Sequence, residues 1–243
     1  MACHFIRWDA TTDSLRTHRL SSDVIEQTSG FSAKRRRRFL QGRILLAEMM
    51  FYLYGIPQLP AIATTPTGRP CFADSHLPDF SLAYAGNTIG VLLSLEGKVG
   101  LDIEVMRARG QNLLRQYLSS TENAWITAQY DRLEAETQLW SIRQSVLKLS
   151  GLSNSEQGSL HLHPFSGHLR SSIAPNVQVM SDAEEYLCWA CAHEPGLNRL
   201  ICWQYDESQG LQKCREISKQ SLPPSTHFLK LTTSPRWQAK STD

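Results

Sequence analysis

Long apolar runs and a strong excess of one charge are both missing from this sequence. No run approaches the ~20 apolar residues of a membrane span, and the opening stretch MACHFIRWDATTDSLRTHRL lacks the apolar centre of a signal peptide. The 25 Lys and Arg against 23 Asp and Glu leave a net charge of +2, too small to indicate a nucleic-acid coat or a membrane-surface protein. We therefore expect a cytoplasmic protein that binds neither nucleic acid nor membrane.

Paired metal-binding cysteines are lacking as well. The Cys-x-x-Cys pair Cys188 and Cys191 has no second pair to complete a zinc site. It lies in the apolar stretch YLCWACAHE, which has the character of a strand, and residues three apart on a strand point to opposite faces. We expect six reduced thiols, with this pair in the core. His161 and His163 share a strand face, but no cysteine or acidic ligand completes a metal set there.

The order of predicted elements is helix, strands, helix, strands. Ser32 is suited to cap a helix with an apolar face that ends at Gly55, and a hairpin with strands near 89–95 and 99–105 follows. A helical region covers about 113–149. Further strands are expected near 159–165, 177–180, 186–192 and 199–205. This order is typical of an α+β fold.

The length of 243 residues suits one large domain or two half-sized lobes. We divide the chain into an N-terminal lobe at 1–105, a C-terminal lobe at 106–212 and a polar tail at 213–243. The tail contains scattered Pro and Ser, so we expect it to wrap the surface or to be disordered. Two lobes in one chain favour a monomer.

The stretch GLDIEV places two carboxylates close together. Side chains two apart on a strand share a face, so Asp102 and Glu104 point to one side while Leu101 and Ile103 point to the other. Two adjacent carboxylates repel each other unless a cation or a proton lies between them. Mg²⁺ held by carboxylates and substrate phosphates fits this pair. An amphipathic edge strand with its polar face in water fits it too.

The stretch WSIRQSVLK forms the second candidate. Trp140, Gln144 and Lys148 fall at successive four-residue steps on one face of a helix, beside a buried apolar stripe. Lys148 and Arg143 give this face the charge to meet an anionic ligand. A solvated helix flank explains the same pattern.

The run KRRRR at 34–38 is the only dense basic cluster, and Arg43 lies further along the same helix. Cations at the start of a helix favour phosphate, because the terminal N–H groups and the helix dipole add to their charge. A solvated helix face, an acidic partner protein or nucleic acid also fits a basic run.

Five stretches taken in order, RRFLQGRILL, TGRPCF, FSLAYAG, VGLDIE and LWSIRQSVLKLSG, resemble the surfactin-type 4′-phosphopantetheinyl transferases. The resemblance is strongest to the enterobacterial holo-acyl-carrier-protein synthase branch, and it runs from about Arg35 to Gly151. It implies two pseudo-symmetric α/β lobes with coenzyme A in the cleft between them. It also implies Mg²⁺-dependent transfer of phosphopantetheine from coenzyme A to a serine of an acyl or peptidyl carrier protein, with release of 3′,5′-ADP.

The resemblance also implies roles for individual residues. Asp102, Glu104, Gln144 and Lys148 match the catalytic positions, and the first three of these match the metal ligands. The positions that match contacts to coenzyme A are Arg36, Arg38, Arg43, Arg69, Pro70, Tyr84 and Lys148.

Two departures from the family pattern bear on activity. The pattern has Lys-Glu where this chain has Arg143-Gln144, and a neutral amide can ligate a metal through its oxygen but cannot accept a proton at neutral pH. The pattern has Ser-His-Ser where this chain has Ala83-Tyr84-Ala85. Three hypotheses follow: an active transferase, a relative that binds carrier protein or coenzyme A without efficient transfer, and a basic nucleic-acid or partner-binding protein that uses Lys34–Arg38.

Overall fold

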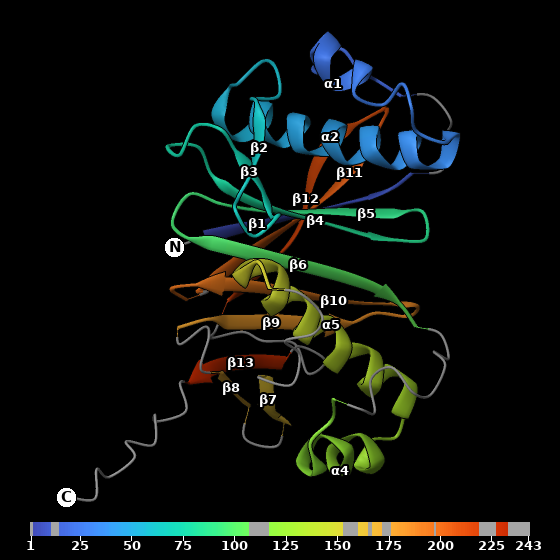
Figure 1. Cartoon of the computed structure of the whole chain (residues 1–243). Helices are drawn as coiled ribbons and strands as arrows, with labels where there is room; N and C mark the ends of the chain where they lie inside the picture. The colour runs from blue at the N-terminus through green and yellow to red at the C-terminus, as the bar shows by residue number, and fades with distance from the viewer. Residues whose placement is uncertain are drawn as a thin grey trace, which may run out of the picture.

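The computed structural model describes residues 2–10, 15–106, 117–152, 160–164, 167–171, 176–196, 198–218 and 227–232. It is a mixed α+β fold, as the sequence predicts. Figure 1 shows two β-sheets lying one against the other, with helix α2 (Ala33–Tyr54) beyond the first sheet and helix α5 (Arg132–Ser150) against the second. No helix in these ranges is long and apolar enough to cross a membrane.

The first sheet has the strand order β12-β11-β1-β5-β4. Its strands are β1 (Ala2–Asp9), β4 (Asp79–Ala85), β5 (Thr88–Ser94), β11 (Arg199–Asp206) and β12 (Gly210–Ser218). Strands β1 and β11 are parallel, and the other neighbours are antiparallel. The short helix α1 (Ser22–Glu26) and the hairpin of β2 (Ile62–Thr64) and β3 (Pro70–Phe72) lie beside this half.

The second sheet has the order β6-β10-β9-β13-β8-β7. Its strands are β6 (Lys98–Val105), β7 (Leu160–His163), β8 (His168–Ser171), β9 (Gln178–Ala183), β10 (Leu187–Glu194) and β13 (His227–Thr232). Helix α4 (Ser120–Ala128) precedes α5. Three apolar clusters fill the spaces between α2 and the first sheet, between the two sheets, and between α5 and the second sheet.

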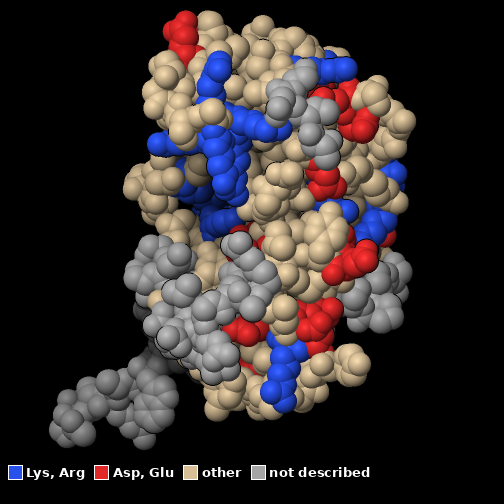
Figure 2. Space-filling model, turned by 90° about the vertical axis from the view of Figure 1, so that its right-hand side faces the viewer, with Lys and Arg blue, Asp and Glu red and all other residues tan. Residues whose placement is uncertain are grey.

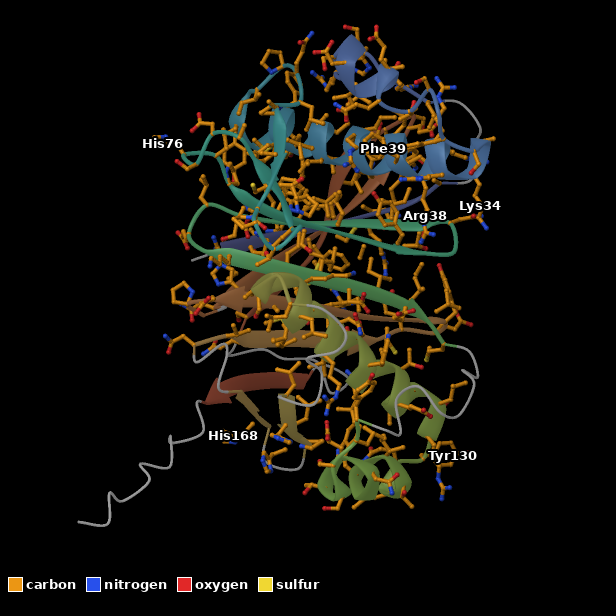
Figure 3. The ribbon with its side chains drawn as sticks, in the orientation of Figure 1. Lys34, Arg38, Phe39, His76, Tyr130 and His168 are labelled. Atoms are coloured by element: carbon orange, nitrogen blue, oxygen red, sulfur yellow. The ribbon has the colours of Figure 1, made fainter. Side chains whose placement is uncertain are left out.

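Helix α2 begins and ends as the sequence predicts. The Ser32 hydroxyl accepts a hydrogen bond from the Arg35 N–H, and Gly55 adopts the left-handed conformation that ends a helix. Leu45, Met49 and neighbouring apolar side chains of one face are buried against the first sheet. Figure 3 labels Lys34 and Arg38, which mark the basic N-terminal end of this helix.

The predicted hairpin of strands 89–95 and 99–105 is wrong in its pairing, although both strands exist. Strand β5 pairs with β1 and β4, whereas β6 pairs with β10 in the other sheet. Side chains of β4 take two N–H groups at the edge of β6: Asp79 Oδ2 accepts from Val99 N at 2.7 Å and Ser81 Oγ accepts from Leu101 N at 2.9 Å. These bonds join the two sheets without a continuous backbone ladder.

The predicted polar tail also needs correction. Residues 213–218 belong to β12, which pairs with β11 in the first sheet, and residues 227–232 form β13, which pairs with β8 and β9. Nor do the sheets divide at residue 105, since β6 lies in the second sheet and β11 returns to the first. The expected pseudo-two-fold relation of two lobes stays a prediction.

The Cys-x-x-Cys pair lies in the core on β10, as predicted. Cys191 is buried between the sheets, where burial raises its pKa, while the Cys188 thiol faces the Glu134 carbonyl on α5. The side chains point to opposite faces of one strand. All six cysteines are free thiols.

Helices α4 and α5 are joined by a fully buried ion pair. Arg143 Nη2 donates to Glu122 Oε1, and both side chains are 0% exposed. Glu122 also accepts from the Ser119 N–H at 2.7 Å through its other oxygen, which completes a capping box at the start of α4. Arg143 further donates to the Tyr117 carbonyl at 3.2 Å. The expectation that Arg143 meets an anionic ligand is therefore wrong, because its guanidinium is turned into the protein.

We predict that Glu122→Ala strongly destabilises the protein. Removing one partner of a buried ion pair leaves an uncompensated charge, which costs about 3–5 kcal/mol. Denaturant titration checks this, with Glu216→Ala as a control that removes an acid from an exposed pair with Lys213. Equal unfolding midpoints for the two variants would contradict the prediction.

Candidate active site

The two carboxylates of β6 lie against α5. Leu101 and Ile103 are buried between the sheets, so the alternate residues Asp102 and Glu104 face the helix. Gly100 permits this close packing, because a Cβ there would lie 1.9 Å from the Ser145 carbonyl oxygen of α5. The helix backbone therefore rests directly on the strand beside the carboxylates.

The row Trp140, Gln144 and Lys148 of α5 meets these carboxylates. Trp140 Nε1 donates to Glu104 Oε1 at 3.0 Å, and Lys148 Nζ donates to Asp102 Oδ1 at 2.8 Å. Gln144 lies in the row between them, one helical turn from each, and is partly exposed. The predicted functional face of the helix is thus a contact surface with the strand, not a solvated flank.

The surroundings of Asp102 disfavour its charged form. Its side chain is buried, and burial, together with the Glu104 carboxylate, raises its pKa to about 6, while the Lys148 ammonium limits the rise. Asp102 Oδ2 is buried and accepts no hydrogen bond from the described residues. A buried carboxylate oxygen without a partner is costly unless a cation or a proton is supplied.

These residues fit a hard divalent cation. Two carboxylates and the amide oxygen of Gln144 are the oxygen donors that Mg²⁺ takes, and Mg²⁺ commonly keeps water and substrate phosphates as further ligands. Within the described ranges, no group of three or more His, Cys, Asp or Glu is arranged to hold a metal. A metal at Asp102 and Glu104 therefore needs oxygens from Gln144, water or a substrate.

A cleft of about 930 Å³ connects this site to the basic start of α2. Its wall includes Glu104 from β6, Tyr84 at the end of β4, and Lys34, Arg36, Arg37 and Arg38 from α2. Figure 2, which views the right-hand side of Figure 1, shows Lys and Arg side chains gathered on the upper half of this face. Four cations and one carboxylate of the pair therefore line the same cleft. This combination suits a ligand with several phosphate groups, which the cations can bind.

Tyr84 is fixed between two arginines. The Arg38 guanidinium lies 4.9 Å from the centre of the Tyr84 ring and donates to the Tyr84 carbonyl at 3.1 Å. The Tyr84 hydroxyl is hydrogen-bonded to Arg43 and lies over Gly42, where a Cβ would approach it to 2.1 Å. Burial raises the pKa of Tyr84 and lowers that of Arg43.

Arg43 lines a neighbouring cavity of about 440 Å³ instead of the main cleft. Its guanidinium stacks on the Phe39 ring at 3.6 Å from the ring centre. The predicted ligand residues thus separate: Arg36, Arg38 and Tyr84 share a cleft with Glu104, while Arg38 and Tyr84 also border the cavity of Arg43.

Arg69 and Pro70 line a different cavity, which they share with Lys148. Together these three residues border an apolar cavity of about 280 Å³, with Phe80, Leu147 and Leu152 in its wall. The Arg69 guanidinium is bound to Asp79 through both carboxylate oxygens. The structure therefore places this predicted pair, together with Lys148, in a different cavity from the cationic cleft.

Four residues that position the site were not predicted to do so from the sequence: Asp79, Ser81, Gly100 and Trp140. The glycine that opens GLDIE signals a close approach to the strand, and the Trp140 indole N–H needs a partner when partly buried. Asp79 and Ser81 give no such signal, because their partners on β6 are 20 residues away in the sequence.

Comparison with known proteins identifies the family. A family model described as the 4′-phosphopantetheinyl transferase superfamily matches residues 98–204. The chain is 39% identical over 236 residues to the Escherichia coli (strain K12) protein named Uncharacterized protein YieE, with 95% of both chains covered. It is 35% identical over 121 residues to the 4′-phosphopantetheinyl transferase AcpT of the same strain, over 48% of this chain and 59% of that one. The Salmonella typhimurium (strain LT2) AcpT is 33% identical over 121 residues, which cover 48% of this chain and 60% of the relative.

The chain belongs to the 4′-phosphopantetheinyl transferase superfamily. The predicted family is confirmed, and the matched region begins at β6 and includes both carboxylates and the α5 row. Membership supports phosphopantetheine transfer as the general class of reaction.

We predict that Asp102→Asn stabilises the protein most at neutral and alkaline pH. Because the pKa of Asp102 is raised to about 6 in the folded protein, its contribution to stability is fully present at low pH and is lost as the pH rises through this value. Asparagine does not ionise, yet its amide oxygen can still accept from Lys148. Thermal melting at about pH 4.5 and about pH 7.5 checks this. A gain in Tm that is larger at the lower pH would contradict the assignment.

Proposed function

We propose that this protein transfers the 4′-phosphopantetheine group from coenzyme A to a serine of an acyl or peptidyl carrier protein, in a Mg²⁺-dependent reaction that releases 3′,5′-ADP. The observation that carries the proposal is the placement of Asp102 and Glu104 against α5, with Glu104 in the wall of a cleft that four cations also line. Family membership supports the reaction class, and the carboxylates beside several cations support binding of a diphosphate with its metal.

Each residue has a chemical task in this reaction. Arg36 and Arg38 bind the anionic nucleotide end in the cleft, and Asp102, Glu104 and the Gln144 amide oxygen hold Mg²⁺. Lys148 extends from α5 to Asp102, where its ammonium group can also meet a phosphate oxygen. Mg²⁺, when bound, neutralises charge on the diphosphate and polarises its phosphorus–oxygen bonds.

The bonding change is a displacement at phosphorus. The serine oxygen of the carrier protein bonds to the phosphorus that bears pantetheine, and the bond from that phosphorus to the bridging oxygen breaks. The bridging oxygen leaves with 3′,5′-ADP. Gln144 does not take the serine proton, since an amide is no base at neutral pH. The proton therefore passes to water or to a phosphate oxygen.

The second candidate is a relative that binds coenzyme A or carrier protein without efficient transfer. Two observations favour it. Gln144 is neutral where the family pattern has an acid, and the Tyr84 hydroxyl is already bonded to Arg43, so it has fewer bonds left to replace the lost Ser-His-Ser contacts. The expected monomer and cytoplasmic location stay predictions under either function.

The direct test is intact-protein mass spectrometry of an apo acyl carrier protein incubated with this protein, coenzyme A and Mg²⁺. We expect a mass gain of one phosphopantetheine group that depends on the metal and is lost in Asp102→Ala. Glu216→Ala, which changes an exposed side chain of β12, serves as the control and should retain activity. No gain across several carrier proteins, with coenzyme A binding intact, would favour the second candidate.

We predict that Gln144→Glu raises the transfer rate by at least about 10-fold, because it restores a base beside the metal ligands. Single-turnover kinetics at saturating Mg²⁺ measure the step directly. Gln144→Ala is the matched control, because it removes the amide oxygen without adding a carboxylate. An unchanged rate in Gln144→Glu would place the limiting defect elsewhere, at Ala83-Tyr84 in particular.

A further inference from the structure

We propose that Arg69 is a positioning residue that fixes Lys148 and β6 relative to each other, and that it is not a ligand of coenzyme A. The kinetic part of this inference rests on the proposed transferase function. The structural part rests on the contacts of one guanidinium group with three elements: β4, β6 and α5.

All three nitrogens of the Arg69 side chain donate to oxygen acceptors of the protein. Nη1 donates to Asp79 Oδ1 at 2.8 Å, and Nη2 donates to the other oxygen of the same carboxylate. Nη2 also lies 2.8 Å from the Val99 carbonyl oxygen and 3.3 Å from that of Phe80. The side chain is only 12% exposed, so a phosphate ligand would have to displace a two-pronged carboxylate.

The remaining contact reaches the catalytic helix. Arg69 Nε donates to the Lys148 carbonyl at 3.1 Å. Lys148 lies in the last turn of α5, where its carbonyl also accepts from the Gly151 N–H at 3.4 Å and where a cation is favoured by the helix dipole. Arg69 thus caps the C-terminal end of α5 at the residue whose side chain binds Asp102.

The same guanidinium holds the strand that carries Asp102. Val99 lies three residues before Asp102 on β6, and its N–H donates to Asp79 Oδ2 at 2.7 Å while its carbonyl accepts from Arg69. The Arg69–Asp79 pair therefore binds β6 at Val99 and α5 at Lys148. These are the two elements whose side chains form the ion pair of the site at 2.8 Å.

The surrounding loop keeps Arg69 in place. The Arg69 N–H donates to Thr65 Oγ1 at 3.0 Å, and its carbonyl accepts from the Thr65 N–H at 2.8 Å. The loop also contacts the end of α5, where a Cβ on Gly151 would lie 2.3 Å from Thr67 Oγ1. The turn before β3 is thereby docked on the helix end.

Two substitutions separate positioning from ligand binding. Arg69→Lys keeps a cation that could bind phosphate but loses the fork that joins Asp79, Val99 and Lys148. Asp79→Asn leaves Arg69 intact and weakens its anchor. If Arg69 positions Lys148, both variants lose about 100-fold in kcat, because a small misplacement of a catalytic group has an effect of this size. The Kd for coenzyme A, measured by calorimetry, then changes less than about threefold. If Arg69 binds coenzyme A, Asp79→Asn keeps the wild-type rate and affinity, which would overturn the proposal.

Hydrogen exchange gives a readout that needs no activity. The N–H groups of Gly151 and Leu152 bond to carbonyls of the last turn of α5. They should exchange at least about 10-fold faster in both variants than in the wild type, because the turn loses its cap. Arg19→Lys is the matched control: Arg19 pairs with Glu48 at 3.1 Å, with side chains 17% and 16% exposed, on the α2 side of the molecule. Exchange equal to the control in both variants would overturn the proposal even if the wild type proved inactive.

A double-mutant cycle completes the test. The double variant Arg69→Lys/Asp79→Asn should be no slower than either single variant, because both remove the same clasp. Additive losses in kcat would show separate roles and contradict the proposal. Should Arg69→Lys fail to fold, as judged by circular dichroism, Asp79→Asn alone decides between the two roles.

Discussion

The packing of α5 on β6 is the contact on which the candidate site depends. The helix backbone lies so close to the strand that only glycine fits at position 100, and this approach brings Trp140 to Glu104 and Lys148 to Asp102. The carboxylates are therefore held by the helix instead of pointing into bulk water. Two ion pairs connect α5 to neighbouring elements. The buried Arg143–Glu122 pair links it to α4, and the Arg69–Asp79 pair links the Lys148 carbonyl to β4.

The charge balance of the site follows from the same contact. Asp102 and Glu104 bring two negative charges, Lys148 brings one positive charge, and Gln144 contributes none at a position where the family pattern has an acid. Burial of Asp102 raises its pKa, and its Oδ2 atom has no partner among the described residues. A cation with a diphosphate offers both the charge and the ligands that this site lacks.

Local patterns in the sequence predict much of this arrangement. The cap at Ser32, the stop at Gly55 and the alternation of Asp102 and Glu104 all depend on residues near one another in the chain, and the structure agrees with them. Partners far apart in sequence were not predictable. Alternation in β6 does not say which strand it pairs with, and Arg143 resembles a surface cation until its partner Glu122 is known. The polar residues after 213 gave no sign of β13, because its pairing with β8 and β9 is decided by the sheet.

The central claim is that Asp102, Glu104 and the cationic cleft bind coenzyme A with one divalent ion between the carboxylates. The most direct measurement is X-ray diffraction from crystals grown with coenzyme A and Mn²⁺, recorded to locate the anomalous signal of the metal. We predict one peak within about 2.3 Å of oxygens from both Asp102 and Glu104, bridged to the diphosphate. Coenzyme A bound in the cleft with the metal elsewhere, or with no metal at all, would contradict the account.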